Sequence, residues 1–409
     1  MQSKDRLYRL LIFCFLLETF CISYGLHFPA FGALLSILYS LSGLVLAFAF
    51  LFLPDLPAIS QSFLKQPAFK WILLAIILDG MCWFGYQRML AEPLAYETAD
   101  MLPIIKVMNE RLLAGHPMQV YDPIPQIWHG TVPIYLPAMW LPYALPLAAG
   151  IDLRWITIAC LFVVFAIFIL RNRFNMHGIF TAAGAALLLC WLFIDDMPGL
   201  LPFSEEGVVI FYYVLLVIAL QRKNPWLTGI AIAICALSRY AFIGWLPALL
   251  LYMIWRKEWR ALLRMSVAGF VTALVLVLPF GWKLLDSLVA LPQSYIAFAG
   301  RVWHDSPEVF TEGPGLARFF GVRHIALQHS LLIVCVLILP VLATWVLLLK
   351  QKKWRIGTAN IPIAMLKLSL VIFYSLVDVP YLYLFYTSSF VSLMMLSGYA
   401  SEKVRIRNG

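Results

Sequence analysis

Long apolar runs alternate with short polar connections along nearly the whole chain. A helix that spans a membrane needs about 20 mostly apolar residues, and runs of this kind recur throughout. The pattern predicts an all-α polytopic membrane protein with about twelve transmembrane helices. We expect these helices near residues 8–25, 30–53, 69–88, 153–171, 178–195, 207–221, 226–241, 243–256, 263–284, 327–350, 359–377 and 380–399.

Two polar connections are much longer than the rest, at 91–152 and 283–325. Connections of this length indicate either a function or local structure of their own. We therefore expect a single membrane domain over 1–409. Its parts are three N-terminal spans (1–90), a first outer loop (91–152), central spans (153–282), a second large outer loop (283–325) and C-terminal spans (326–409).

The stretch PIYLPAMWLPYALPLAAG at 133–150 is apolar, but its internal prolines disfavour a regular spanning helix. Counting it as a span would also place several clusters of basic residues on the outer side. We expect it to lie along the outer membrane interface, where Trp140 and Tyr143 would suit the headgroup level.

Composition supports the membrane class, because 63% of the residues are hydrophobic and only 12% are charged. The formal net charge of +9 has a topological origin. Most of the 30 basic residues fall on one set of connections if the N-terminus is cytoplasmic. The positive-inside rule then predicts that both termini are cytoplasmic. We expect the protein in the cell (inner) membrane. We expect membrane lipid, and no nucleic acid, as a partner.

The charged residues Glu18, Asp79 and Lys367 fall well inside the expected spans, away from the span ends. A charge at the centre of a spanning helix costs about 2.5 to 3.5 kcal/mol unless it is paired or hydrated. Lys367 lies too deep in its span to reach the surface with ease. We expect it to form a structural ion pair, with Asp79 as a candidate partner, and contact with a ligand phosphate is the alternative.

A series of motifs resembles the GT-C glycosyltransferases, and within them glycosyltransferase family 87. Asp100 is followed by LLAG (112–115), VYDP (120–123) and the proline-rich stretch, as in the outer loop of that family. LTGIAIAICALSRYAFIGWLPALLLYMIWRKEWR (227–260) is similar to its pair of short helices with a basic residue, here Arg239, at the apex. IDDMPGLLPFSEEG (194–207) takes the place of its second polar loop.

The chain departs from the family pattern in four places. Three spans rather than one precede the first outer loop, and SEEG stands where many members have Gln and Asn. The apex residue is often Lys rather than Arg. Ile134 and Tyr135 replace the second proline of the usual pair.

The resemblance implies transfer of mannose or a similar hexose from a polyprenyl-phosphate-linked sugar donor. The acceptor would be a glycan or glycolipid at the outer face of the membrane. This reaction needs a base at the acceptor hydroxyl. We predict Asp100 as that base, with Glu97, one helical turn earlier, as the alternative or as a group that holds the acceptor. Asp100 is equally suited to cap a helix over 101–113.

The departing phosphate needs positive charge. Arg239 is the first candidate, although it lies near enough to the outer surface to extend into water instead. Arg301 and His304, in RVWHDSPE, are further candidates for contact with sugar or phosphate, and an ordinary polar loop is the alternative. We expect Asp100 and Arg239 to border one outward-facing cavity that is open sideways to lipid.

The second polar loop carries Asp195, Asp196, Glu205 and Glu206. Such acids are able to bind a divalent cation, Mg or Mn. A solvated loop, or favourable negative charge at the start of the next helix, explains them equally well. No metal is required by the motifs themselves.

Two other classes of function stay open on the sequence. A polytopic carrier or lipid flippase would show internal symmetry and paired broken helices. The sequence has no visible repeat, and its acids gather on one side, which favours the enzyme. A ligase or polymerase of envelope polymers is poorly separated from a glycosyltransferase by these features.

Overall fold

The computed structural model describes residues 2–24, 27–53, 66–94, 101–127, 131–172, 174–194, 204–354 and 356–400. These residues are helical almost throughout. Their only β-type pairing is an isolated antiparallel bridge between Ile124 and Thr131. The predicted all-α class is confirmed.

Every segment expected to span the membrane coincides with a helix. The N-terminal helices are α1 (Gln2–Tyr24), α2 (Gly32–Phe50) and α3 (Ala68–Ala91). The central ones are α7 (Trp155–Arg171), α8 (Met176–Phe193), α10 (Glu206–Gln221), α11 (Pro225–Ala236), α12 (Trp245–Trp255) and α13 (Trp259–Val277). The C-terminal ones are α16 (Ile325–Trp354), α17 (Ile361–Leu376) and α18 (Tyr386–Ala400).

Six helices in the described part of the chain are long and apolar enough to cross a membrane, as expected of a membrane protein. They are α2, α3, α8, α13, α16 and α17, some extended by a short 3-10 turn. Helices α7, α10, α11, α12 and α18 are also apolar but shorter.

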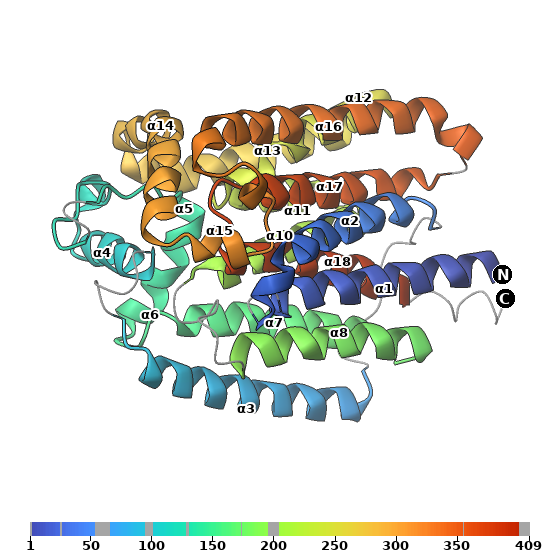
Figure 1. The fold of residues 1–409 in the computed structure, drawn as a ribbon, viewed down its shortest axis with the longest axis horizontal. Coiled ribbons are helices and arrows are strands. Elements are labelled where there is room, and N and C mark those ends of the chain that lie inside the picture. Colours follow the sequence, from blue (N-terminus) through green and yellow to red (C-terminus); the bar gives the residue numbers. More distant parts are fainter. Residues whose placement is uncertain are drawn as a thin grey trace.

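Helices also form within both long connections. The first contains α4 (Met101–Leu113), α5 (Pro137–Trp140) and α6 (Ala144–Ala148), and the second contains α14 (Trp282–Asp305) and α15 (Glu308–Glu312). Figure 1 shows these elements gathered at one end of the bundle, whereas α1 begins at the opposite end. The non-spanning elements therefore build one cap on the helix bundle.

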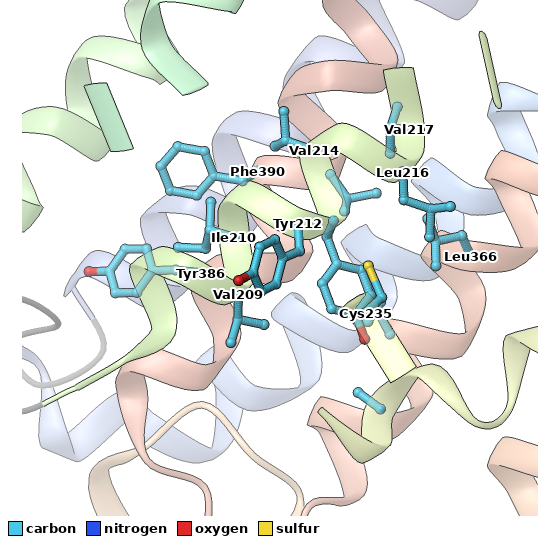
Figure 2. Packing of buried hydrophobic residues seen from close by; sticks show 14 of the residues in the cluster. Val209, Ile210, Tyr212, Val214, Leu216, Val217, Cys235, Leu366, Tyr386 and Phe390 are labelled. Carbon is cyan, nitrogen blue, oxygen red and sulfur yellow. The ribbon is translucent and has the colours of Figure 1, made fainter. Parts of the chain in front are cut away.

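Helix α10 forms the centre of the bundle. Most of its side chains are buried, because it is apolar on all faces and other helices surround it. It packs against α7, α11 and α18. Figure 2 shows its Val209, Ile210 and Tyr212 near Tyr386 and Phe390 of α18, with Cys235 of α11 close by. The first residue of this central helix is Glu206.

The proline-rich stretch is broken into α5, a 3-10 turn (Leu141–Tyr143) and α6, so it forms no continuous spanning helix, as the prolines predicted. The expectation that its aromatic residues face the lipid headgroups was wrong, because Trp140 and Tyr143 are fully buried inside the protein. The Trp140 indole donates to the Tyr121 hydroxyl at 3.3 Å, and the Tyr143 and Thr157 hydroxyls lie 3.0 Å apart. The stretch packs inward because its polar ring atoms find partners there.

Lys367 forms the buried ion pair expected of it, but its partner is Glu18 and not Asp79. Both side chains are fully buried between α1 and α17. The Ser388 hydroxyl donates to the same carboxylate at 3.0 Å, and the Ser392 hydroxyl donates to its other oxygen at 2.8 Å. Asp79 is exposed on α3. Sequence spacing alone did not reveal that α1, rather than α3, supplies the partner of Lys367.

Candidate functional site

Arg239 lies at the turn between the two short helices α11 and α12, as the sequence predicted. Its backbone is extended (φ −144°, ψ 139°), and a 3-10 turn follows it (Tyr240–Phe242). The proline-rich stretch packs against this turn, because the Ala138 N–H donates to the Leu237 carbonyl at 3.0 Å. The cap thus holds the apex of the helix pair in place.

The Arg239 guanidinium bonds to both glutamates at the start of α10. Its Nε and Nη2 donate to Glu206 Oε2 at 3.0 and 2.6 Å, and Nη2 also donates to Glu205 Oε1. Both carboxylates are fully buried, whereas 14% of the Arg239 side chain is exposed. A solvated loop is therefore the wrong reading for these two acids, which anchor the arginine.

Further bonds hold the Glu206 carboxylate from its other side. The Thr387 hydroxyl donates to Oε1 at 2.5 Å, and the Tyr374 hydroxyl lies at 3.4 Å from the same oxygen. The Glu206 N–H donates to the Ser204 hydroxyl at 3.0 Å, at a helix N-terminus where negative charge is favourable. A charged group that is buried and fully bonded keeps one geometry, so Glu206 fixes the plane of the guanidinium.

The Nη1 amino group of Arg239 takes no part in these bonds. Arg239 lines a cavity of about 360 Å³ between the α11–α12 turn and the helices α14, α16 and α17. The apolar wall is formed by Leu332, Ile333, Val336, Leu337 and Phe373, among others. The cavity is therefore a mostly apolar space with a guanidinium at its polar end.

Two further ionisable side chains, His329 and Asp378, line the same cavity. His329 Nδ1 lies 2.6 Å from Asp378 Oδ2, and this contact joins α16 to the connection after α17. Asp378 is 2% exposed, and its other oxygen, Oδ1, is buried with no bonding partner. Burial raises the pKa of the Asp378 carboxyl above its usual range, although the bond and the charge of His329 oppose this. The pair leaves His329 Nε2 available to a ligand.

We did not identify His329 and Asp378 from the sequence. His329 lies near the start of a long apolar run and Asp378 follows another, and neither belongs to a motif. They could have been found as ionisable residues in or beside an expected span, since such residues mark candidate functional sites.

Comparisons with models of protein families, with curated proteins and with solved structures find no match for this chain. The site is therefore interpreted from its own geometry.

The predicted bases Asp100 and Glu97, and the acids Asp195 and Asp196, lie outside the described residues. Met101, which follows Asp100, accepts a hydrogen bond on its sulfur from the Tyr383 hydroxyl at 3.2 Å. Tyr383 belongs to a 3-10 turn (Leu382–Phe385), and Leu384 of the same turn lines the cavity. The start of α4 therefore lies against an element of the cavity wall.

Arg301 and His304 do not join Arg239 in the cavity. Both lie near the exposed C-terminal end of α14, where Arg301 packs over the Phe298 ring at 6.0 Å. His304 is 88% exposed, and its Nδ1 lies 2.8 Å from Asp305 Oδ1. Tyr295, earlier on the same helix, is the residue of α14 that lines the cavity.

In the described part of the chain no three His, Cys, Asp or Glu side chains gather as ligands for a metal ion. Glu205 and Glu206 face Arg239 instead. Binding of Mg or Mn by Asp196 together with these glutamates stays a prediction.

Proposed function

We propose that the protein is a membrane glycosyltransferase of the GT-C type. It would transfer a hexose such as mannose from a polyprenyl-phosphate donor to a lipid-linked or envelope glycan acceptor. The reaction would take place at the outer face of the cell (inner) membrane. In this proposal the chain crosses the membrane twelve times and both termini are cytoplasmic.

The observation that carries the proposal is the cavity between the α11–α12 turn, α16 and α17, with Arg239 at its polar end. A lipid-linked substrate needs an apolar path for its chain beside a fixed polar group for its phosphate. The apolar wall gives little preference over bulk lipid, because lipid tails are themselves apolar. Selectivity would therefore come from the polar end, where Arg239 is held by two buried carboxylates.

The charge change in the reaction suits this polar end. The bond between the anomeric carbon and the phosphate oxygen breaks, and its electron pair stays on the phosphate. The donor phosphodiester thereby becomes a phosphate monoester with additional negative charge. Donors aimed at that developing charge accelerate the reaction. Arg239 Nη1 has free donors for it, and His329 lines the same cavity.

The acceptor hydroxyl forms the new bond to the anomeric carbon and releases its proton. We propose Asp100 as the group that accepts this proton, with Glu97 as the alternative. The contact between Met101 and Tyr383 supports this assignment, because it places the residue next to Asp100 against an element of the cavity wall.

The test is transfer from labelled polyprenyl-phosphate mannose, glucose or arabinose to candidate lipid acceptors by purified protein. We expect transfer by the wild type, and strong loss in Asp100→Asn and in Arg239→Ala. Arg301→Ala is the matched control, since Arg301 is an exposed arginine that does not line the cavity. Transfer that survives Asp100→Asn would remove Asp100 from the mechanism. Absence of transfer with every donor, together with ligand accumulation in proteoliposomes, would favour a carrier.

A further inference from the structure

Two helix connections on the far side of the bundle from Arg239 both contain an Arg-Lys pair followed closely by a tryptophan. RKNPW (222–226) joins α10 to α11, and RKEW (256–259) joins α12 to α13. Helix α10 begins at Glu206, which bonds Arg239, and ends 16 residues later, about 24 Å away along its axis. By the distribution of basic residues, this end of the bundle is the one predicted to be cytoplasmic.

Both preceding helices end in the same hydrogen-bond pattern. The Lys223 N–H donates to the Leu220 carbonyl at 3.1 Å, and the Asn224 N–H donates to the Ala219 carbonyl at 3.3 Å. After α12, the N–H groups of Lys257 and Glu258 bond to the carbonyls of Ile254 and Met253, both at 3.0 Å. This is the Schellman arrangement, in which the residue after the cap is left-handed and is usually glycine.

A lysine takes the glycine position in each connection. Lys223 (φ 53°) and Lys257 (φ 57°) are the two residues other than glycine with positive φ in the described part of the chain. A residue with a Cβ is less stable than glycine in this conformation. Backbone strain of this kind is an observation from which a role for the side chain can be inferred.

Lys223 lines a second cavity, of about 210 Å³, between the two connections and the start of α17. Arg256 and Glu258 also line it, and Arg256 Nε lies 3.7 Å from Glu258 Oε1. The charged lining thus has two cations and one carboxylate. Leu249, Met253 and Met265 supply an apolar side. A cavity with excess positive charge and an apolar flank matches an amphiphilic anion.

Two exposed tryptophans place this cavity at the depth of the lipid headgroups. Trp226 and Trp259 follow the two lysine turns and are 49% and 57% exposed. Exposed tryptophan is typical of the membrane–water interface. Basic pockets between helices on the cytoplasmic side bind the headgroups of anionic lipids.

We propose that this cavity binds the headgroup of an anionic phospholipid, with its phosphate between Lys223 and Arg256 and its acyl chains in the surrounding bilayer. The site is separate from the proposed transfer reaction and does not depend on it.

The test compares lipid retention by the full-length protein in nanodiscs of phosphatidylcholine with and without phosphatidylglycerol, measured by native mass spectrometry. We expect preferential retention of phosphatidylglycerol by the wild type. Lys223→Gly should reduce it about fivefold, the effect of one basic residue near an anionic lipid. The same substitution relieves the backbone, so the melting temperature without phosphatidylglycerol should stay equal or rise. If Lys223→Gly retains less phosphatidylglycerol but keeps its melting temperature, the loss of lipid is due to the missing charge and not to unfolding.

Lys257→Gly is the matched control, because it removes the same charge and relieves the same left-handed backbone at a residue that does not line the cavity. We expect a much smaller effect from it. Equal retention of the two lipids by the wild type, or equal losses in the two glycine variants, would overturn the proposal. Displacement of the bound lipid by inorganic phosphate alone would assign the site to a free anion and would also overturn it.

Discussion

Arg239 and Glu206 connect the apex of the α11–α12 pair to the first residue of the central helix. Arg239 Nε and Nη2 both donate to Glu206 Oε2, at 3.0 and 2.6 Å. Lysine has the same charge but only one nitrogen. The planar guanidinium of arginine donates to Glu206 through two nitrogens and keeps its third, Nη1, for another partner. The geometry of the guanidinium, as well as its charge, is thus fixed by α10.

Arg239→Lys should therefore lose most of the proposed transfer activity even though it keeps the charge. Removal of one well-placed donor at a developing anion costs about 100- to 1,000-fold in kcat. The measurement is kcat with a labelled polyprenyl-phosphate sugar, and Arg301→Lys serves as the control. A rate near that of the wild type in Arg239→Lys would show that Nη1 does not act on the phosphate.

His329→Gln should reduce kcat at least about tenfold, because the imidazole that lines the cavity is lost. Asp378→Asn should act in the same direction but less strongly, since it disturbs only the orientation of the ring. His324→Gln is the matched control. His324 is exposed just before the same helix, and its Nδ1 lies 2.9 Å from the Phe320 carbonyl oxygen. Equal kcat values for the two histidine variants would contradict a role for His329.

The positions of the long apolar helices were predictable, because each needs only a local run of apolar residues. Helix α14 was expected as part of a loop. Its 24 residues mix polar and apolar side chains, so no apolar run marked it. The partner of Lys367 was not predictable from the sequence, since the pairing depends on which helices are neighbours. Local composition determines where an apolar helix lies in the sequence. Which helices are neighbours depends on contacts between segments that are distant in the sequence.

For the candidate site, too, the sequence predicted the position of a residue but not its partners. Arg239 could be placed at an apex because it interrupts an apolar stretch between two short helices. Its bonds to Glu205 and Glu206 join segments more than 30 residues apart, and no spacing rule predicts them. Likewise, His329 and Asp378 meet only because α16 packs along α17.

Lys367→Met should destabilise the protein by about 3 to 5 kcal/mol, because Glu18 would remain as a buried carboxylate without its cation. The double variant Lys367→Met with Glu18→Gln should recover much of this loss. Denaturation in detergent, followed by tryptophan fluorescence, gives the free energy of unfolding for each variant. If the two single effects simply add in the double variant, the ion pair contributes no coupling.

Gly244→Ala should disturb the wall of the larger cavity. A Cβ at this position would lie 2.3 Å from the Val336 carbonyl oxygen and 2.2 Å from Val336 Cγ1. Val336 itself lines the cavity, so α12 must move away from α16. We expect a loss of about 1 to 3 kcal/mol in the free energy of unfolding. Gly80→Ala on α3, where a Cβ would meet nothing within 4 Å, should leave stability unchanged or slightly higher. Equal stability of the two variants would contradict this packing.

Asp152 and Arg154 join the C-terminal end of α3 to the N-terminal end of α7, and this contact should make stability depend on pH. Arg154 is buried and bonds to Asp152 and to the carbonyls of Met89 and Glu92. Burial opposes ionisation of Asp152, but the hydrogen bonds and charge of Arg154 outweigh it and hold the pKa below its ordinary value of 3.8.

A carboxyl whose pKa is lower in the folded state stabilises the protein when the pH is above the ordinary value. This contribution is lost as the pH falls from there through the folded-state pKa. Asp152→Asn should thus lower the melting temperature at neutral pH, and its difference from the wild type should shrink only below about pH 4. Thermal denaturation of both proteins across acidic buffers measures this. A difference that stays constant in acid would mean that the contact with Arg154 does not depend on the charge of Asp152.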